Sequence, residues 1–171
     1  MGIKLKIFIY GGTGYIGRSL ISGLSHKYQV FASSRNKKKT IKKINILSEK
    51  EDKKKIEQKL RVSDIILIAN GPSFEDSKKN LFSYVKYLDK QLEFLLKEKK
   101  KNAKIIYFSS IHVYENYESQ EANTSILLNS RSHYGIRNIV CENLLLSKFK
   151  KKNINIIRLS NIFGIQKNLS K

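Results

Sequence analysis

The sequence predicts a doubly wound α/β fold, in which a parallel sheet carries helices on both faces. Three observations support this prediction. Short runs rich in β-branched residues alternate with longer amphipathic patterns along the chain. The segment 64–69 (DIILIA) is an almost continuous apolar run, which is typical of a strand covered on both faces. A glycine-rich turn directly follows the first expected strand and opens the first expected helix.

The expected elements alternate from one end of the chain to the other. Strands are expected over residues 4–10, 29–33, 44–47, 64–69, 103–109 and 155–159, and helices over 15–25, 49–60, 74–99 and 132–150. Right-handed crossovers between such strands place helices on both faces of the sheet. Functional residues are then expected just beyond the carboxyl ends of the strands. We expect one domain over residues 1–171.

The composition excludes several classes of protein. A chain of 171 residues with 40% hydrophobic residues can bury a core, so general disorder is excluded. The one cysteine, Cys141, excludes a disulfide framework and a four-cysteine zinc site, and we expect no metal site. No apolar run approaches the roughly 18 residues of a membrane span, and the first residues do not resemble a signal peptide. A cytoplasmic protein is therefore expected.

The net charge of +20 allows two interpretations. The 34 basic residues could bind a polyanion such as nucleic acid, or they could form a solvated surface. The lysines occur in short scattered runs, no aromatic residues alternate with them, and only six basic residues are arginine. The solvated surface is therefore favoured over nucleic-acid binding. Such a surface would still attract small anionic molecules.

The glycine-rich turn predicts a phosphate-binding site. Gly11, Gly14 and Gly17 have the spacing at which one glycine makes the tight turn, one lets the backbone approach a pyrophosphate and one lets the helix pack closely on the sheet. The start of the helix then offers free N–H groups to the phosphate. The alternative is a purely structural turn. The expected cofactor contacts here are Gly11, Thr13, Gly14, Tyr15, Ile16 and Gly17.

The end of the second strand bears on the type of cofactor. An acidic residue there would hold the adenosine ribose and favour NAD. The chain instead has Ser34 and Arg35, which could hold a 2′-phosphate. This favours NADP over NAD, unless Arg35 merely belongs to the basic surface.

With these features in place, the chain resembles the extended short-chain dehydrogenase/reductase family, the NAD(P)-dependent sugar-nucleotide epimerases and dehydratases. The segments that carry the resemblance are, in order, YGGTGYIG (10–17), DIILIA (64–69), YFSSIHVY (107–114), YGIRNIVCENLL (134–145) and RLSNIFG (158–164). The resemblance implies a Rossmann fold, a nicotinamide cofactor and a nucleotide-sugar substrate.

The resemblance also implies roles for individual residues. Ser110 would hydrogen-bond the substrate, and Tyr134 would be the catalytic acid/base during hydride transfer. The family places a lysine four residues after this tyrosine, but here Asn138 occupies that position, so its charge is missing. Arg137 is expected to point about 100° away around the helix. The remaining residues expected to contact the cofactor are Ala69, Asn80 and Ser109, together with Tyr134 and Asn138. The residues expected to contact the substrate are His112 and Asn161.

These interpretations leave local alternatives open. Ser109 and Ser110 could simply cap the end of their strand, Tyr134 could be a surface residue, and His112 could be an ordinary loop residue.

The length of the chain is a second departure from the family. Members continue beyond the RLSNIFG segment into a substrate domain, whereas this sequence ends at Lys171. Two functions therefore remain: an epimerase/dehydratase-type oxidoreductase acting on a nucleotide-activated sugar, or a catalytically impaired dinucleotide-binding or regulatory module. A partner chain could complete the site. The helices at 74–99 and 132–150 resemble the pair through which family members dimerise, so a homodimer is expected.

Overall fold

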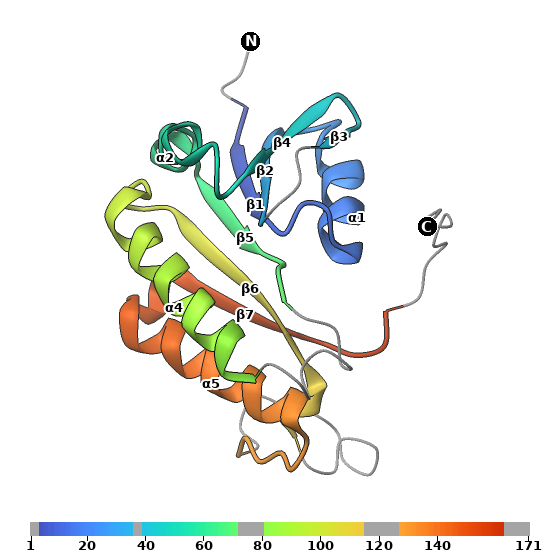
Figure 1. Ribbon diagram of the computed structural model, residues 1–171, viewed down its shortest axis with the longest axis vertical. Coiled ribbons are helices and arrows are strands. Elements are labelled where there is room, and N and C mark those ends of the chain that lie inside the picture. The colour runs from blue at the N-terminus through green and yellow to red at the C-terminus, as the bar shows by residue number, and fades with distance from the viewer. Residues whose placement is uncertain (1–3, 36–38, 72–80, 115–126, 163–171) are drawn as a thin grey trace.

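The computed structural model describes residues 4–35, 39–71, 81–114 and 127–162 (Figure 1). The strands are β1 (Lys6–Tyr10), β2 (Gln29–Ser34), β3 (Lys39–Ile41), β4 (Ile44–Ser48), β5 (Ile65–Ile68), β6 (Lys104–Ser110) and β7 (Ile154–Leu159). The α-helices are α1 (Tyr15–Leu24), α2 (Lys53–Val62), α4 (Leu81–Glu98) and α5 (His133–Lys148). Short 3₁₀ turns cover Ile111–Val113 and Lys151–Asn153.

The described strands form one twisted sheet with the order β3-β4-β2-β1-β5-β6-β7. Every neighbouring pair from β4 to β7 is parallel. Helix α1 lies on one face, and α2, α4 and α5 lie on the other (Figure 1). The strand order reverses direction at β1, which is the arrangement of a doubly wound, Rossmann-type fold. The predicted fold class is confirmed.

The sequence prediction was wrong at one edge of the sheet, where β3 pairs with β4 in antiparallel orientation. The two strands are joined by Lys42 and Lys43, whose φ values of 47° and 64° form a tight hairpin turn. Such turns usually carry Asn-Gly or a similar pair. The lysine pair lacks that signal, so β3 was missed and the sheet was expected to be entirely parallel.

Two apolar clusters hold the layers together. The smaller one packs α1 through Ile21 against Ile9 and Ala32 of the central strands. The larger one packs α2, α4 and α5 against the opposite face of β1, β5 and β6, with Leu88, Leu92 and Leu95 of α4 fully buried. Cys141 belongs to this larger cluster and is a buried free thiol.

Helix boundaries agree with the sequence prediction except at α2. That helix was expected over residues 49–60, but it begins at Lys53, after an N-cap at Asp52. The carboxylate of Asp52 instead accepts a hydrogen bond from the backbone N–H of Ser48, which leaves residues 49–52 as a connecting turn. The expected helix at 74–99 is described from Leu81 onward, and its first seven positions lie outside the described residues.

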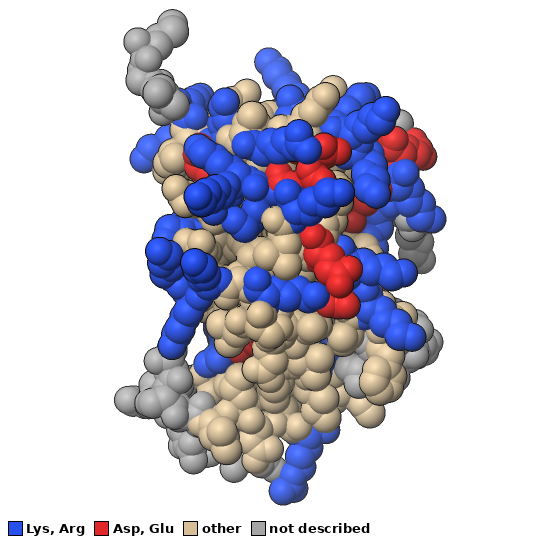
Figure 2. Space-filling view, turned by 90° about the vertical axis from the view of Figure 1, so that its left-hand side faces the viewer, with Lys and Arg blue, Asp and Glu red and all other residues tan. Residues whose placement is uncertain are grey.

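Charge is distributed unevenly over the helical side of the molecule. Figure 2 shows Lys and Arg side chains crowded over the upper part of this face, interrupted by a few acidic residues. The lower part, at the level of the first turns of α4 and α5 in Figure 1, is largely uncharged.

Candidate functional site

The glycine turn lies at the carboxyl edge of the sheet, directly against the end of β5. Gly11 has a φ of +84°, and a Cβ there would lie 2.8 Å from the backbone of Ala69 and Asn70. The backbone N–H groups of Gly11 and Gly12 both donate to the carbonyl of Ser33, over 3.1 and 2.8 Å. The turn is therefore anchored between the ends of β2 and β5, and only glycine fits at position 11.

The start of α1 is built for close backbone approach. A Cβ on Gly17 would lie 2.1 Å from the carbonyl oxygen of Gly11, so the helix can pack on the turn only because residue 17 is glycine. Gly14 is the N-cap of α1, which has no side-chain cap and no acidic residue in its first turn. The first N–H groups of a helix lack intrahelical partners and favour an anion. Tyr15 and Gly14 are exposed beside them, while Thr13 and Ile16 are half-buried.

The second strand ends in two residues with different environments. Ser34 is buried, whereas Arg35 is exposed and its guanidinium lies 5.8 Å from the centre of the Tyr87 ring on α4. The hydroxyl of Ser33 donates to the carboxylate of Glu49, which follows β4. The hydroxyl of Tyr87 donates to the same carboxylate. Glu49 therefore ties the ends of β2 and β4 to α4.

Glu49 is an acid that the sequence analysis did not single out. Burial raises the pKa of its carboxyl above the ordinary value, opposed by hydrogen bonds from Tyr87 and Ser33 and by the charge of Arg35. Its role depends on a hydrogen bond from Tyr87, which lies 38 residues further along the sequence. No local pattern around position 49 predicts such a contact.

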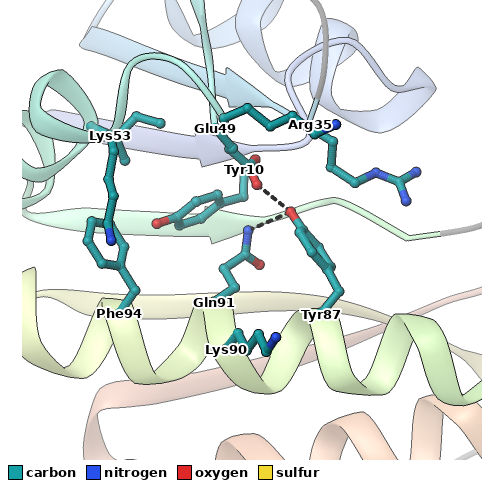
Figure 3. Close-up of a pocket in the computed structure, with 10 residues that line it drawn as sticks. Tyr10, Arg35, Glu49, Lys53, Tyr87, Lys90, Gln91 and Phe94 are labelled. Carbon is teal, nitrogen blue, oxygen red and sulfur yellow. Dashed lines mark hydrogen bonds between the residues drawn. The ribbon is translucent and has the colours of Figure 1, made fainter.

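Beside these residues lies a groove of about 440 Å³ between α2 and α4, which we call the α2–α4 groove (Figure 3). Its lining residues are Tyr10, Arg35, Glu49, Lys50, Lys53, Ile56, Tyr87, Lys90, Gln91 and Phe94. None of them except Arg35 was a predicted site residue.

At the end of β6, the two candidate serines have different partners. The hydroxyl of Ser109 donates to the carboxylate of Glu142 over 2.5 Å, so it points toward α5. The buried Glu142 also accepts two hydrogen bonds from the Arg158 guanidinium, over 3.1 and 2.8 Å. The hydroxyl of Ser110 accepts a hydrogen bond from the backbone N–H of His112 and caps the 3₁₀ turn. Ser109 thus holds the strand against the helix that carries Tyr134.

The start of α5 packs tightly against the loop after β6. A Cβ on Gly135 would lie 2.0 Å from the carbonyl oxygen of His112, so a side chain there would separate the two elements. The rings of His112 and Tyr134 meet edge to face, with centroids 5.5 Å apart. The structure therefore brings the end of β6 and the turn that follows it next to Tyr134.

Asn138 and Arg137 lie differently from what the sequence predicted. Asn138 is 2% exposed, and its side-chain amide donates to the carbonyl of Tyr134 while its Oδ1 accepts from Arg137. Arg137 was expected to point away, but its long side chain brings its Cζ 4.4 Å from the centre of the Tyr134 ring. The guanidinium also lies 4.0 Å from where a Cβ of Gly71, beyond β5, would be. A positive charge therefore does reach Tyr134.

The remaining predicted residues have no common environment. Ala69 is half-buried and lies against the glycine turn, and Asn161 is exposed beyond β7. Asn80 lies outside the described residues. Within the described ranges, no group of three or more His, Cys, Asp or Glu side chains is arranged to hold a metal ion. No described helix has both the length and the hydropathy of a membrane span.

Comparison with known proteins now bears on this geometry. Residues 7–170 match the sequence model of the NAD dependent epimerase/dehydratase family. The chain belongs to this family. Among curated proteins, no relative matches.

Solved epimerases and dehydratases of sugar nucleotides have the same fold as this family member. UDP-N-acetylglucosamine 4-epimerase from Bacillus cereus superposes with a TM-score of 0.67 at 19% identity, covering 89% of this chain and 51% of its own. UDP-glucuronic acid 4-epimerase from the same organism, in complex with UDP-glucuronic acid and NAD, gives 0.70 at 19%, with 90% and 56% covered. The NDP-hexosamine 5,6-dehydratase TunA, described as NAD dependent, gives 0.71 at 21%, with 91% and 54% covered. The chain therefore spans about half the length of these structures.

Proposed function

We propose that this chain binds a nicotinamide dinucleotide and takes part in hydride transfer on a nucleotide-activated sugar. The observation that carries the proposal is the cradle formed by Gly11, Gly14 and Gly17. At Gly11 and Gly17 a side chain would collide with backbone, and at Gly14 the uncapped start of α1 is exposed. A pyrophosphate fits such a cradle because backbone N–H groups and the helix dipole both favour an anion. The residues present therefore fit the cofactor.

NADP is the proposed cofactor in preference to NAD. The support is the exposed guanidinium of Arg35 at the end of β2, within an open, basic edge. Arginine suits a phosphate because its planar fork can donate two parallel hydrogen bonds. Ser34 is buried, so its contribution would come through its backbone or a small shift of the strand end.

The chemical step rests on Ser110 and Tyr134. When bound, the nicotinamide would accept or supply the hydride. Tyr134 would give or take the proton of the sugar hydroxyl, and Ser110 would orient that hydroxyl by a hydrogen bond. Arg137 lies over the Tyr134 ring and holds a positive charge there. Asn138 supports this arrangement through its bond to the Tyr134 carbonyl.

A second function is favoured by one specific observation. Asn138 is 2% exposed and both of its polar groups already contact the protein, so the ribose contact expected of it would require the side chain to move. A chain with an intact cradle and no such contact would be a catalytically impaired dinucleotide-binding or regulatory module. Four further expectations remain proposals. They are substrate contacts at His112 and Asn161, a partner chain that completes the site, a homodimer and a cytoplasmic location.

Titration with NADPH and NADH, followed by calorimetry at two salt concentrations, tests the proposal. We expect saturable binding that prefers NADPH and survives higher salt. Arg35→Gln should remove the preference, whereas the control Lys101→Gln, at an exposed position on the turn before β6, should keep it. Absence of binding would overturn the proposal. So would binding that disappears at higher salt to the same extent for NADPH and for any other polyanion. Binding without turnover of UDP-glucuronic acid or UDP-N-acetylglucosamine would favour the second function.

A further inference from the structure

The α2–α4 groove has the composition of a small-molecule site. At about 440 Å³ it falls in the size range of ligand pockets. Its apolar lining includes Ile56 from α2 and Phe94 from α4, and Figure 3 shows the Phe94 ring rising from α4. Apart from the cations of its rim, polar groups enter the groove from Tyr10, Glu49, Tyr87 and Gln91. An apolar groove with a few convergent polar groups is typical of a site for an organic ligand.

The Tyr10 hydroxyl supplies the observation that points most directly to a ligand. Tyr10 is 2% exposed, and its hydroxyl oxygen has no hydrogen-bond partner within the described structure. Figure 3 shows this hydroxyl pointing along the groove toward Lys53 and Phe94. Buried hydroxyls are nearly always satisfied, so an unpartnered one facing a groove indicates a place for an acceptor. Burial also raises the pKa of Tyr10, so the hydroxyl remains able to donate.

The charge of the groove is mainly positive. Four cations lie at its exposed rim, against the single carboxylate of Glu49 inside: Arg35, Lys50, Lys53 and Lys90. Two of them lie over aromatic walls. Lys53 Nζ is 5.5 Å from the centre of the Phe94 ring, and Arg35 Cζ is 5.8 Å from that of Tyr87. The rim therefore complements an anionic group on a ligand whose ring lies against these walls.

We propose that the α2–α4 groove is a second ligand site, which binds a small aromatic anion such as an aromatic carboxylate. The ring lies between Ile56 and Phe94, an acceptor oxygen takes the hydrogen bond of Tyr10, and Lys53 neutralises the anionic group. The site is distinct from the phosphate cradle. Gly12 of the cradle packs toward Ile21 on the α1 face of the sheet, whereas Tyr10 points to the opposite face.

Salicylate is the probe, and its neutral amide, salicylamide, is the matched ligand control. The protein is labelled on isoleucine methyl groups and titrated by NMR. We expect salicylate to shift the resonance of Ile56, which lines the groove, and to leave that of Ile21, a buried residue of α1, unchanged. Salicylamide should bind at least about fivefold more weakly, because it lacks the charge. Binding should persist when NADPH is saturating, because Arg35, which the proposed function assigns to the cofactor, lies at the other end of the groove from Lys53 (Figure 3).

Two variants test the assigned contacts. Tyr10→Phe removes only the hydroxyl and should weaken salicylate about fivefold to tenfold, while Tyr28→Phe, outside the groove, should not. Lys53→Met, on the exposed rim, should also weaken it, and the adjacent Lys54→Met should not. Equal binding to native protein and Tyr10→Phe would overturn the proposal. Displacement of salicylate by NADPH would overturn it too, since the groove would then be part of the cofactor site. NADPH binding together with a failure of salicylate to shift Ile56 would overturn it without affecting the proposed function.

Discussion

The guanidinium of Arg137 lies over the ring of Tyr134, with Arg137 Cζ 4.4 Å from the ring centroid. Residues three apart on a helix are neighbours on its surface, and the length of the arginine side chain lets it fold back over the ring. Arg137 also contacts Asn138, through a 3.3 Å hydrogen bond from Nη2 to Oδ1. A cation therefore lies beside Tyr134, and it comes from position 137.

This relationship predicts the effect of restoring the family lysine. Asn138→Lys would bury an ammonium group beside the Arg137 guanidinium, and repulsion between the two should destabilise the protein by about 2–4 kcal/mol. The double variant Asn138→Lys with Arg137→Met removes one of the charges and should recover part of the loss. Urea unfolding measures both. Unchanged stability in the single variant would mean that the lysine reaches solvent.

The glycine cradle allows a matched pair of substitutions within α1. Gly17→Ala places a Cβ 2.1 Å from the Gly11 carbonyl, so it should cost about 2–4 kcal/mol of stability and reduce NADPH binding. Gly23→Ala meets nothing within 4 Å and should raise stability by about 0.5–1 kcal/mol, because alanine favours the helix. Thermal unfolding and calorimetric titration test the pair. Equal effects at both positions would contradict the steric explanation.

The ion pair between the buried Glu142 and the partly exposed Arg158 is expected to couple α5 to β7. Glu142→Leu leaves the guanidinium without its main partner and should cost about 3–5 kcal/mol. Arg158→Leu should cost a similar amount, and the double variant should cost clearly less than the sum. A urea-unfolding double-mutant cycle measures this coupling. Strict additivity would show that the two side chains act independently.

Glu49 should make stability depend on pH in a defined direction. Burial raises the pKa of its carboxyl above the ordinary 4.5, so the folded protein holds a proton that the unfolded chain has lost. Stability should therefore fall as the pH rises from about 4.5 through the folded-state pKa. Asp64 and Glu98 have lowered pKa values, so their contribution to stability is lost only as the pH falls below that window. Glu49→Gln should flatten the pH dependence of urea unfolding above about pH 4.5. An unaltered slope in this variant would assign the effect to another group.

A homodimer through α4 and α5 is predicted from their exposed apolar residues. Phe82 of α4 is 76% exposed, and Ile136 and Val140 are exposed on α5. Phe82→Glu should shift sedimentation toward the monomer. Val62→Glu, on α2, should leave the dimer intact. A native chain that sediments as a monomer at high concentration would contradict the prediction.

The sequence predicted well those features that depend on local pattern. Apolar runs, helical spacing and the glycine turn each reflect contacts within a few residues or a strong backbone constraint. The β3–β4 hairpin was missed because Lys42 and Lys43 adopt positive φ without the usual turn residues. The placement of Arg137 was wrong because the angle around the helix fixes only the direction of the Cα–Cβ bond. The guanidinium at the end of this long side chain lies where it contacts Tyr134 and Asn138.

Periodicity and glycine spacing were sufficient to predict the doubly wound fold and the glycine turn after β1. Three contacts became known from the folded chain alone: Glu49 meets Tyr87, Ser109 points to Glu142, and Tyr10 directs its hydroxyl into the α2–α4 groove. These contacts join residues from different strands and helices. Their distances depend on how the layers pack, and packing depends on the whole set of buried side chains rather than on any one segment.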